Sequence, residues 1–152
     1  MLGTRADLLL TYHIAGAGKV VMPELREPGR TDELWRTTCF ELFLRLDDGE
    51  RYVEFNFSPS TQWAAYAFDG YREGMAQLDM PRAPVVERLT NGVNVALEFS
   101  HLPHGELAMA LTAVLEEEGG VKSFWSLAHP PGAPDFHHPA CFAAKLPSPR
   151  GP

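Results

Sequence analysis

Two neighbouring stretches, TTCFELFLRL (residues 37–46) and RYVEFNF (residues 51–57), carry the strongest structural signal in the chain. In each of them large apolar side chains recur at every second position, as they do in a β-strand with one buried face. The linker DDGE (residues 47–50) has the composition of a tight turn. We therefore expect the two stretches to pair as a β-hairpin.

This hairpin predicts which polar side chains lie near one another. Glu41 belongs to the polar face of the first stretch, and Glu54 and Asn56 belong to that of the second. Side chains on the same face of two paired strands are neighbours in space. We therefore expect Glu41, Glu54 and Asn56 on one side of a sheet.

Glycine and proline, thirteen of each among 152 residues, divide the rest of the chain into short runs. Alternating apolar and polar residues predict strands at 93–99 and 121–128. Residues 63–68 suit either a strand or a helical turn, and we favour the strand. Residues 107–118 are rich in Ala, Leu and Glu, which favours a helix, but the glycines on both sides suit a strand that enters a hairpin. We favour the strand here too.

Short strands between frequent turns predict an all-β fold, a single-domain antiparallel β-sandwich of the jelly-roll-like kind. The length of 152 residues supports one hydrophobic core rather than two. We place the domain at residues 1–146 and expect residues 147–152 to form a flexible tail.

The composition argues against several classes of function. The formal net charge of −7 at pH 7 disfavours binding to nucleic acid or to an anionic membrane surface. No run approaches the ~20 apolar residues of a membrane helix, and no secretory signal pattern is seen. Cys39 and Cys141 alone make no disulfide framework, so we expect a reducing, cytoplasmic setting, with one Cys39–Cys141 bridge as the alternative.

Three tryptophans are candidate ligand contacts. Trp35 and Trp63 each follow polar residues, and Trp125 lies in the predicted strand 121–128. A flat indole at a loop edge suits the C–H face of a sugar ring, and neighbouring amides and carboxylates suit its hydroxyl groups. The alternative is that the three rings fill the ends of the sandwich.

The segment HPPGAPDFHH (residues 129–138) gathers imidazoles and a carboxylate. Such side chains are transition-metal ligands, so His129, Asp135, His137 and His138 are candidates for a metal site. Adjacent histidines on an extended backbone point to opposite sides, however, and prolines stiffen the loop. We therefore favour a structural or ligand-binding loop over a metal site.

Glu41 and Glu54 form a possible catalytic pair. Two carboxyl groups ~5–9 Å apart can hydrolyse a glycosidic bond. The alternative is an ordinary polar network with an arginine such as Arg36, Arg45 or Arg72. No nucleophile elbow, phosphate-binding loop or dinucleotide fingerprint occurs in the chain. We therefore expect no enzymatic activity.

Several strings resemble the bacterial DOMON-like domain family, which is similar to family 9 carbohydrate-binding modules. They are LWRTTCFELF (34–43), YVEFNFSPS (52–60), WAAY (63–66), YREGM (71–75), and WSLAHP with PDFHH (125–138). The resemblance spans about residues 7–146. It implies a jelly-roll-like β-sandwich of about ten strands.

The resemblance also implies a ligand, since the wider DOMON group binds either sugars or haem. In sugar-binding relatives two tryptophans clamp a terminal saccharide, and Trp35 and Trp125 are the candidates here, with Glu41, Asn56 and Arg72 as polar partners. In haem-binding relatives Met and His supply the axial ligands. Met75 or Met80 with His129 would be the candidates in this chain.

We therefore expect non-catalytic binding of a small-molecule or oligosaccharide ligand. Haem or metal binding and a protein-interaction or structural role are the alternatives. No cofactor is expected, with haem or a structural calcium ion as the alternative. The candidate ligand-binding residues are Trp35, Arg36, Glu41, Asn56, Trp63, Arg72, Trp125, His129, Asp135 and His137.

Overall fold

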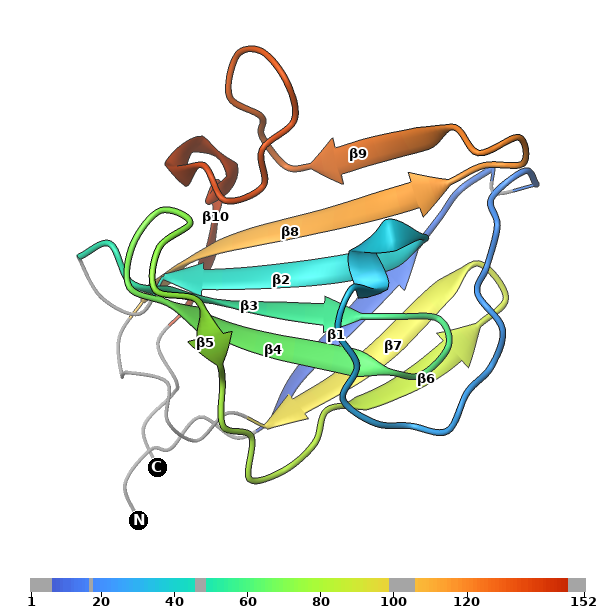
Figure 1. Ribbon diagram of the computed structural model, residues 1–152, viewed down its shortest axis with the longest axis horizontal. Helices are drawn as coiled ribbons and strands as arrows, with labels where there is room; N and C mark the ends of the chain where they lie inside the picture. The colour runs from blue at the N-terminus through green and yellow to red at the C-terminus, as the bar shows by residue number, and fades with distance from the viewer. Residues whose placement is uncertain (1–6, 17, 46–48, 99–105, 148–152) are drawn as a thin grey trace.

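A computed structural model describes residues 7–16, 18–45, 49–98 and 106–147 of the chain (Figure 1). The described part consists of β-strands and two short 3₁₀ turns, η1 (Leu34–Arg36) and η2 (Pro139–Cys141). The strands are β1 (Asp7–His13), β2 (Cys39–Arg45), β3 (Tyr52–Phe57), β4 (Trp63–Phe68), β5 (Ala76–Gln77), β6 (Val85–Leu89), β7 (Gly92–Glu98), β8 (Leu107–Glu116), β9 (Lys122–Ser126) and β10 (Ala144–Leu146).

The strands form two antiparallel sheets that pack face to face. The small sheet has the order β1-β7-β6, and the large one has the order β10-β8-β2-β3-β4-β5. β8 pairs with β2 along one edge, while β10 and β9 share its other edge. In Figure 1 the small sheet lies behind the large one. The prediction of an all-β antiparallel sandwich is therefore confirmed.

The predicted hairpin is formed by β2 and β3. Glu41 lies opposite Asn56, and Phe43 lies opposite Glu54, so the three polar residues share one face as expected. The predicted strands at 63–68, 93–99, 107–118 and 121–128 correspond to β4, β7, β8 and β9. Residues 46–48 and 99 and the predicted tail beyond Pro147 lie outside the described residues.

β8 is a strand despite its helix-favouring composition. It pairs with β2 over Leu111 and Thr112 and has strands on both edges. These ladder hydrogen bonds and the buried apolar side chains outweigh an intrinsic preference worth only tenths of a kcal/mol per residue.

The main core lies between the two sheets. It combines Phe40, Leu42, Phe55 and Phe57 of the large sheet with the apolar side chains of β7, among them Val95. The side chains of β2 that point the other way are buried as well, so β2 is buried on both faces. A second layer must therefore cover the outer face of the large sheet.

This second layer comes from the C-terminal segment and from η1. Phe136, Cys141 and Phe142 pack at one end of the outer face against residues that include Phe43, and Leu34 of η1 packs at the other end. Both cysteines of the chain are buried and free, so the alternative of a Cys39–Cys141 bridge is not realised. No helix among the described residues has the length and apolarity needed to cross a membrane.

Candidate functional site

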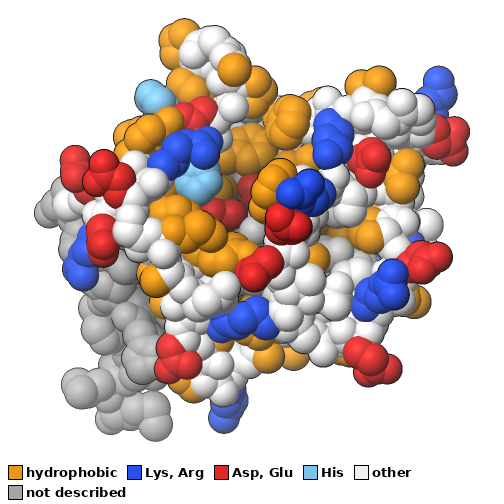
Figure 2. Space-filling view, in the orientation of Figure 1, with side chains coloured by type: hydrophobic (Ala, Val, Ile, Leu, Met, Phe, Trp, Pro, Cys, Tyr) orange, Lys and Arg blue, Asp and Glu red, His pale blue; other side chains and the backbone are white. Residues whose placement is uncertain are grey.

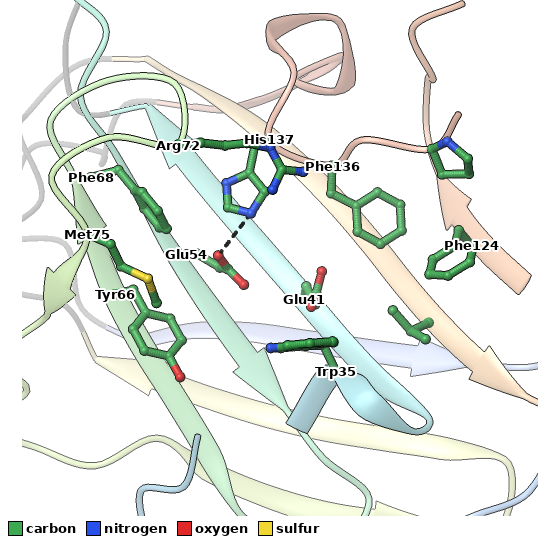
Figure 3. Close-up of a pocket in the computed structure, with 12 residues that line it drawn as sticks. Trp35, Glu41, Glu54, Tyr66, Phe68, Arg72, Met75, Phe124, Phe136 and His137 are labelled. Atoms are coloured by element: carbon green, nitrogen blue, oxygen red, sulfur yellow. Dashed lines mark ion pairs between the residues drawn. The ribbon is translucent and has the colours of Figure 1, made fainter. Parts of the chain in front are cut away.

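A cavity of about 490 Å³ opens on the outer face of the large sheet, between η1, the β4–β5 loop, β9 and the C-terminal segment. In Figure 2 hydrophobic side chains surround the hollow, acidic side chains lie within it, and a histidine and basic side chains stand at its rim. The lining residues are Trp35, Glu41, Glu54, Tyr66, Phe68, Arg72, Met75, Val114, Phe124, Pro134, Phe136 and His137 (Figure 3).

Two carboxyl groups form the floor of this cavity. Glu41 and Glu54 are 3% and 6% exposed, and each comes from the middle of its strand. Asn56 faces Glu41 directly across the ladder, which makes Glu54 the diagonal neighbour of Glu41. Diagonal neighbours on one face have Cα atoms ~7–8 Å apart, within reach of each other's long side chains.

Burial shifts the Glu41 carboxyl group toward its neutral form. Its Oε1 accepts a hydrogen bond from Thr112 Oγ1 at 3.1 Å. Burial raises the pKa of Glu41 well above its usual value, and the nearby charge of Glu54 raises it further. Burial therefore favours the protonated form of the Glu41 carboxyl group, whereas the hydrogen bond from Thr112 favours the carboxylate.

Glu54 titrates near neutral pH. Burial raises the pKa of its carboxyl group to about 7, while Asn56 and then Arg72 act in the opposite direction. The Asn56 amide lies close enough to favour the charged carboxylate, but its geometry falls short of a hydrogen bond, and Nδ2 and Oδ1 of Asn56 have no partner among the described residues. Glu54 is therefore divided between its two protonation states at neutral pH.

His137 covers Glu54 from above. Its Nε2 lies 3.6 Å from Oε1 of Glu54 (dashed in Figure 3). Burial and then the charge of Arg72 lower the pKa of His137 to about 4, so the imidazole is uncharged near pH 7. The contact at neutral pH is therefore one between a carboxyl group and a neutral ring rather than an ion pair.

Tyr52 orients this ring. Its hydroxyl oxygen lies 2.7 Å from Nδ1 of His137 and accepts a hydrogen bond from the backbone N–H of Arg72 at 3.2 Å. The hydroxyl proton is then available for Nδ1, which favours the tautomer with the ring proton on Nε2, facing Glu54. The rings of Phe43 and Phe68 contact the imidazole edge-on.

Arg72 and Asp135 form the polar rim. Nη2 of Arg72 donates to Oδ1 of Asp135 at 2.7 Å, the Tyr71 hydroxyl donates to Oδ2, and the backbone N–H of His137 donates to Oδ1 at 3.2 Å. Although partial burial acts to raise it, the hydrogen bonds from Tyr71 and Arg72 lower the pKa of Asp135. Asp135 is therefore ionised and neutralises the charge of Arg72.

The backbone of the β4–β5 loop is unusual where it carries Arg72. Arg72 and Gly74 both have positive φ, at 52° and 68°. The backbone N–H of Asp69 donates to the carbonyl of Glu73 at 2.9 Å and closes the loop. A non-glycine residue in this conformation is strained, and such strain is common where a side chain must be aimed at a site.

Aromatic rings form the walls. Trp35 stands at the mouth, 47% exposed, on the turn η1 that follows Glu33 in a left-handed conformation with φ 62°. The guanidinium of Arg36 lies 5.2 Å from the centroid of the Trp35 ring and is ion-paired to Glu33. The wall also includes Tyr66, whose hydroxyl donates to Asp32 Oδ1 at 2.6 Å. Arg36 is thus placed against the outside of the Trp35 ring rather than in the cavity lining.

The other two tryptophans lie elsewhere. Trp63 is 6% exposed in the core between the sheets, with the guanidinium of Arg30 4.5 Å from its ring centroid. Trp125 is exposed and lines a second cavity, of about 540 Å³, together with Tyr12 and Leu111. Phe124 and Trp125 are adjacent on β9 and face opposite sides, so the structure does not bring Trp35 and Trp125 together as a clamp.

The remaining candidates are also separated. His129 is exposed, with its ring centroid 6.3 Å from that of Phe136, and Nδ1 of His138 accepts from the backbone N–H of Ala140. Within the described ranges no three side chains of His, Cys, Asp or Glu are arranged to hold a metal ion. Met75 lines the cavity, whereas Met80 packs against the main core, so neither is paired with His129.

Sequence reasoning missed most of the wall. Tyr66 lies opposite Glu54, and Phe68 lies opposite Tyr52, so the alternation of β4 and the order of the strands would have placed both rings beside the carboxyl groups. No comparable sequence pattern predicts the position of Phe136, because an irregular loop that packs on a sheet face has no periodic pattern in its sequence.

A scan against models of known protein families, a search of curated proteins and a search of solved structures each returned no match. The similarity to DOMON-like domains therefore stays a prediction from the sequence.

Proposed function

We propose that the cavity on the outer face of the large sheet binds a small saccharide without chemical change. The observation that carries this proposal is the half-exposed ring of Trp35 at the mouth of a cavity whose floor holds Glu41 and Glu54. A sugar ring has an apolar C–H face and a polar rim of hydroxyl groups, which matches an indole above and carboxyl groups below.

The size and polarity of the site support this proposal. The volume of about 490 Å³ falls within the ~300–1,000 Å³ typical of small-molecule sites. The carboxyl groups of Glu41 and Glu54 can accept hydrogen bonds and Nε2 of His137 can donate one, so the site offers both kinds of partner to hydroxyl groups. Asn56, which lies opposite Glu41 on the neighbouring strand, is fully buried and does not line the cavity.

Titration calorimetry and tryptophan fluorescence with a panel of mono- and disaccharides test the proposal. We expect binding in the micromolar to millimolar range, as is usual for so small a ligand. Trp35→Ala should abolish binding. Trp125→Ala is the matched control, because Trp125 lines the other cavity, and it should leave the affinity unchanged. No heat and no fluorescence change with any sugar at millimolar concentration would overturn the proposal.

One observation favours a second candidate, glycoside hydrolysis. Burial raises the pKa of both Glu41 and Glu54, that of Glu54 to about 7, and a glycosidase needs one acid and one ionised carboxylate close together. Chromogenic aryl glycosides test this candidate. Release of the aryl group by the protein but not by its Glu54→Gln variant would establish it, and no release would remove it.

A further inference from the structure

We propose that the ligand is an amino sugar, whose protonated amino group is held between the floor carboxylates and the aromatic walls. This inference rests on the proposed saccharide site and names the class of sugar that it selects. The geometry that carries it is the burial of two neighbouring carboxyl groups, Glu41 and Glu54, beneath aromatic rings, with no ion pair to Lys or Arg among the described residues.

The partners of the floor carboxyl groups are uncharged. Among the described residues Glu41 bonds to the hydroxyl of Thr112, and the nearest ring to Glu54 is the neutral imidazole of His137. The positive charge closest to them, Arg72, is already satisfied by Asp135 at 2.7 Å. A buried carboxylate without a cation is costly, and a ligand that brings a cation removes this cost.

The aromatic walls of the cavity also favour a positively charged group. Trp35, Tyr66, Phe68, Phe124 and Phe136 all line the cavity. The faces of aromatic rings attract an ammonium group, most strongly where water is excluded. A neutral sugar gains the stacking contact with Trp35, but it gains neither the attraction of a cation to the floor carboxylates nor that of a cation to the aromatic faces. The cavity should therefore prefer an amino sugar to its hydroxyl counterpart.

The preference for amino sugars should depend on pH. An ammonium group is bound best by ionised Glu54, which holds its proton about half of the time near pH 7. Binding should therefore release a proton, and affinity should rise between about pH 6 and about pH 8 for an amine that stays protonated. The titratable and charged groups that face Glu54 are Cys39 and Glu41 of β2, Tyr52 of β3, Tyr66 of β4, Arg72 of the β4–β5 loop, and Asp135 and His137 of the C-terminal segment.

Calorimetry of the full-length chain with four sugars tests the inference. The probes are 6-amino-6-deoxyglucose and glucosamine, compared with glucose and with N-acetylglucosamine, which keeps the nitrogen but loses the charge. We expect the amino sugars to bind about tenfold more tightly or better, as for a hydrogen bond to a charged group. Titrations of 6-amino-6-deoxyglucose, whose amine stays protonated, in two buffers of different ionisation enthalpy should show proton release, and titrations of glucose should show none.

Two variants test whether the preference for amino sugars comes from Glu41 and Glu54 at the floor of the cavity. Glu54→Gln keeps the shape of the side chain and removes its charge, so the ratio of amino-sugar to neutral-sugar affinity should fall to near one. Glu41→Gln is the second variant, and it should lower this affinity ratio less, because burial and the charge of Glu54 raise the pKa of Glu41 and so favour its neutral form. Glu118→Gln removes the same charge from an exposed position outside the cavity and should preserve the ratio.

The outcomes separate the two proposals. Equal affinity for charged and neutral sugars would overturn the amino-sugar inference and leave the saccharide site standing. A preference that survives in both floor variants would overturn the assignment to Glu41 and Glu54. If none of the four sugars binds, the amino-sugar inference is wrong. If no sugar of the wider panel binds either, the proposal of a saccharide site is wrong as well.

Discussion

The imidazole of His137 stands over the carboxyl group of Glu54, with Nε2 3.6 Å from Oε1 (Figure 3). The two residues are far apart in the sequence, and they meet because the C-terminal segment folds across the outer face of the large sheet. Burial moves the pKa of Glu54 to about 7 and that of His137 to about 4, so neither group titrates in its ordinary range.

The stability of the protein should depend on pH through both residues, with opposite signs. In the folded protein Glu54 keeps its proton up to about pH 7. Its contribution to the free energy of unfolding is therefore complete below about pH 4, the pKa of a glutamate in the unfolded chain, and is lost as the pH rises toward 7. In the folded protein His137 resists protonation. Its contribution to the free energy of unfolding is therefore present above about pH 6.5, the pKa of a histidine in the unfolded chain, and is lost as the pH falls toward 4.

Two variants should separate these opposing slopes. Relative to the unmodified protein, Glu54→Gln should make the slope of the unfolding free energy against pH more positive between about pH 4 and about pH 7, and His137→Gln should make it more negative between about pH 4 and about pH 6.5, each by at most about 1.4 kcal/mol per pH unit. Urea unfolding at several pH values measures both profiles. Parallel profiles in the two variants would contradict the assignment.

Removing the charge of Asp135 should lower both pKa values. Asp135 neutralises Arg72, and Arg72 lowers the pKa of Glu54 and of His137. In Asp135→Asn the guanidinium charge is uncompensated, so we expect the carboxyl of Glu54 to titrate below about 7. Carboxyl-carbon NMR titration measures this. Asp79→Asn, at an exposed position on the β5–β6 connection, is the control and should leave the titration of Glu54 unchanged.

The tryptophans should differ sharply in their effect on stability. Trp63 is buried in the main core, so Trp63→Ala should lower the free energy of unfolding by about 3–5 kcal/mol. Trp35 is half exposed, so Trp35→Ala should cost less than about 1 kcal/mol. Urea unfolding followed by circular dichroism checks both. A large loss in Trp35→Ala would mean that its ring is part of the packing rather than free for a ligand.

Gly74 should be required for the loop that carries Arg72. It has a φ of 68°, and a Cβ atom there would clash with the side chain of Asp69. Gly74→Ala should therefore cost about 1 kcal/mol or more and weaken ligand binding, because Arg72 is displaced. Gly29→Ala is the control, since a Cβ at Gly29 meets nothing within 4 Å and its φ is not positive. Equal effects of the two substitutions would refute this role.

Much of the architecture could be predicted because strand formation leaves a local trace. The alternation in residues 37–57 placed Glu41 and Asn56 on one face, and the register of β2 and β3 bears this out. The same reasoning identified β8 as a strand from the glycines around it rather than from its composition. Backbone geometry makes side chains alternate regardless of what lies on either side, so these features need no tertiary information.

The candidate site was only half predictable. Period-two alternation separates the two faces of β9 but does not say what lies on each, so Trp125 was expected beside Trp35 and lies on the other cavity. The low exposure of Glu41 was equally invisible, because the outer layer that buries it is built from segments distant in the sequence.

The amino-acid sequence by itself therefore determined the all-β class, the hairpin and the polar face that it presents, because alternation and turn chemistry act between near neighbours in the chain. Only the tertiary structure decided which ring stands at a cavity, which is buried, and that His137 meets Glu54. Those outcomes depend on how loops and the C-terminal segment cover a sheet face. The resulting loss of water around the carboxyl groups, a property of no single segment, sets their charge.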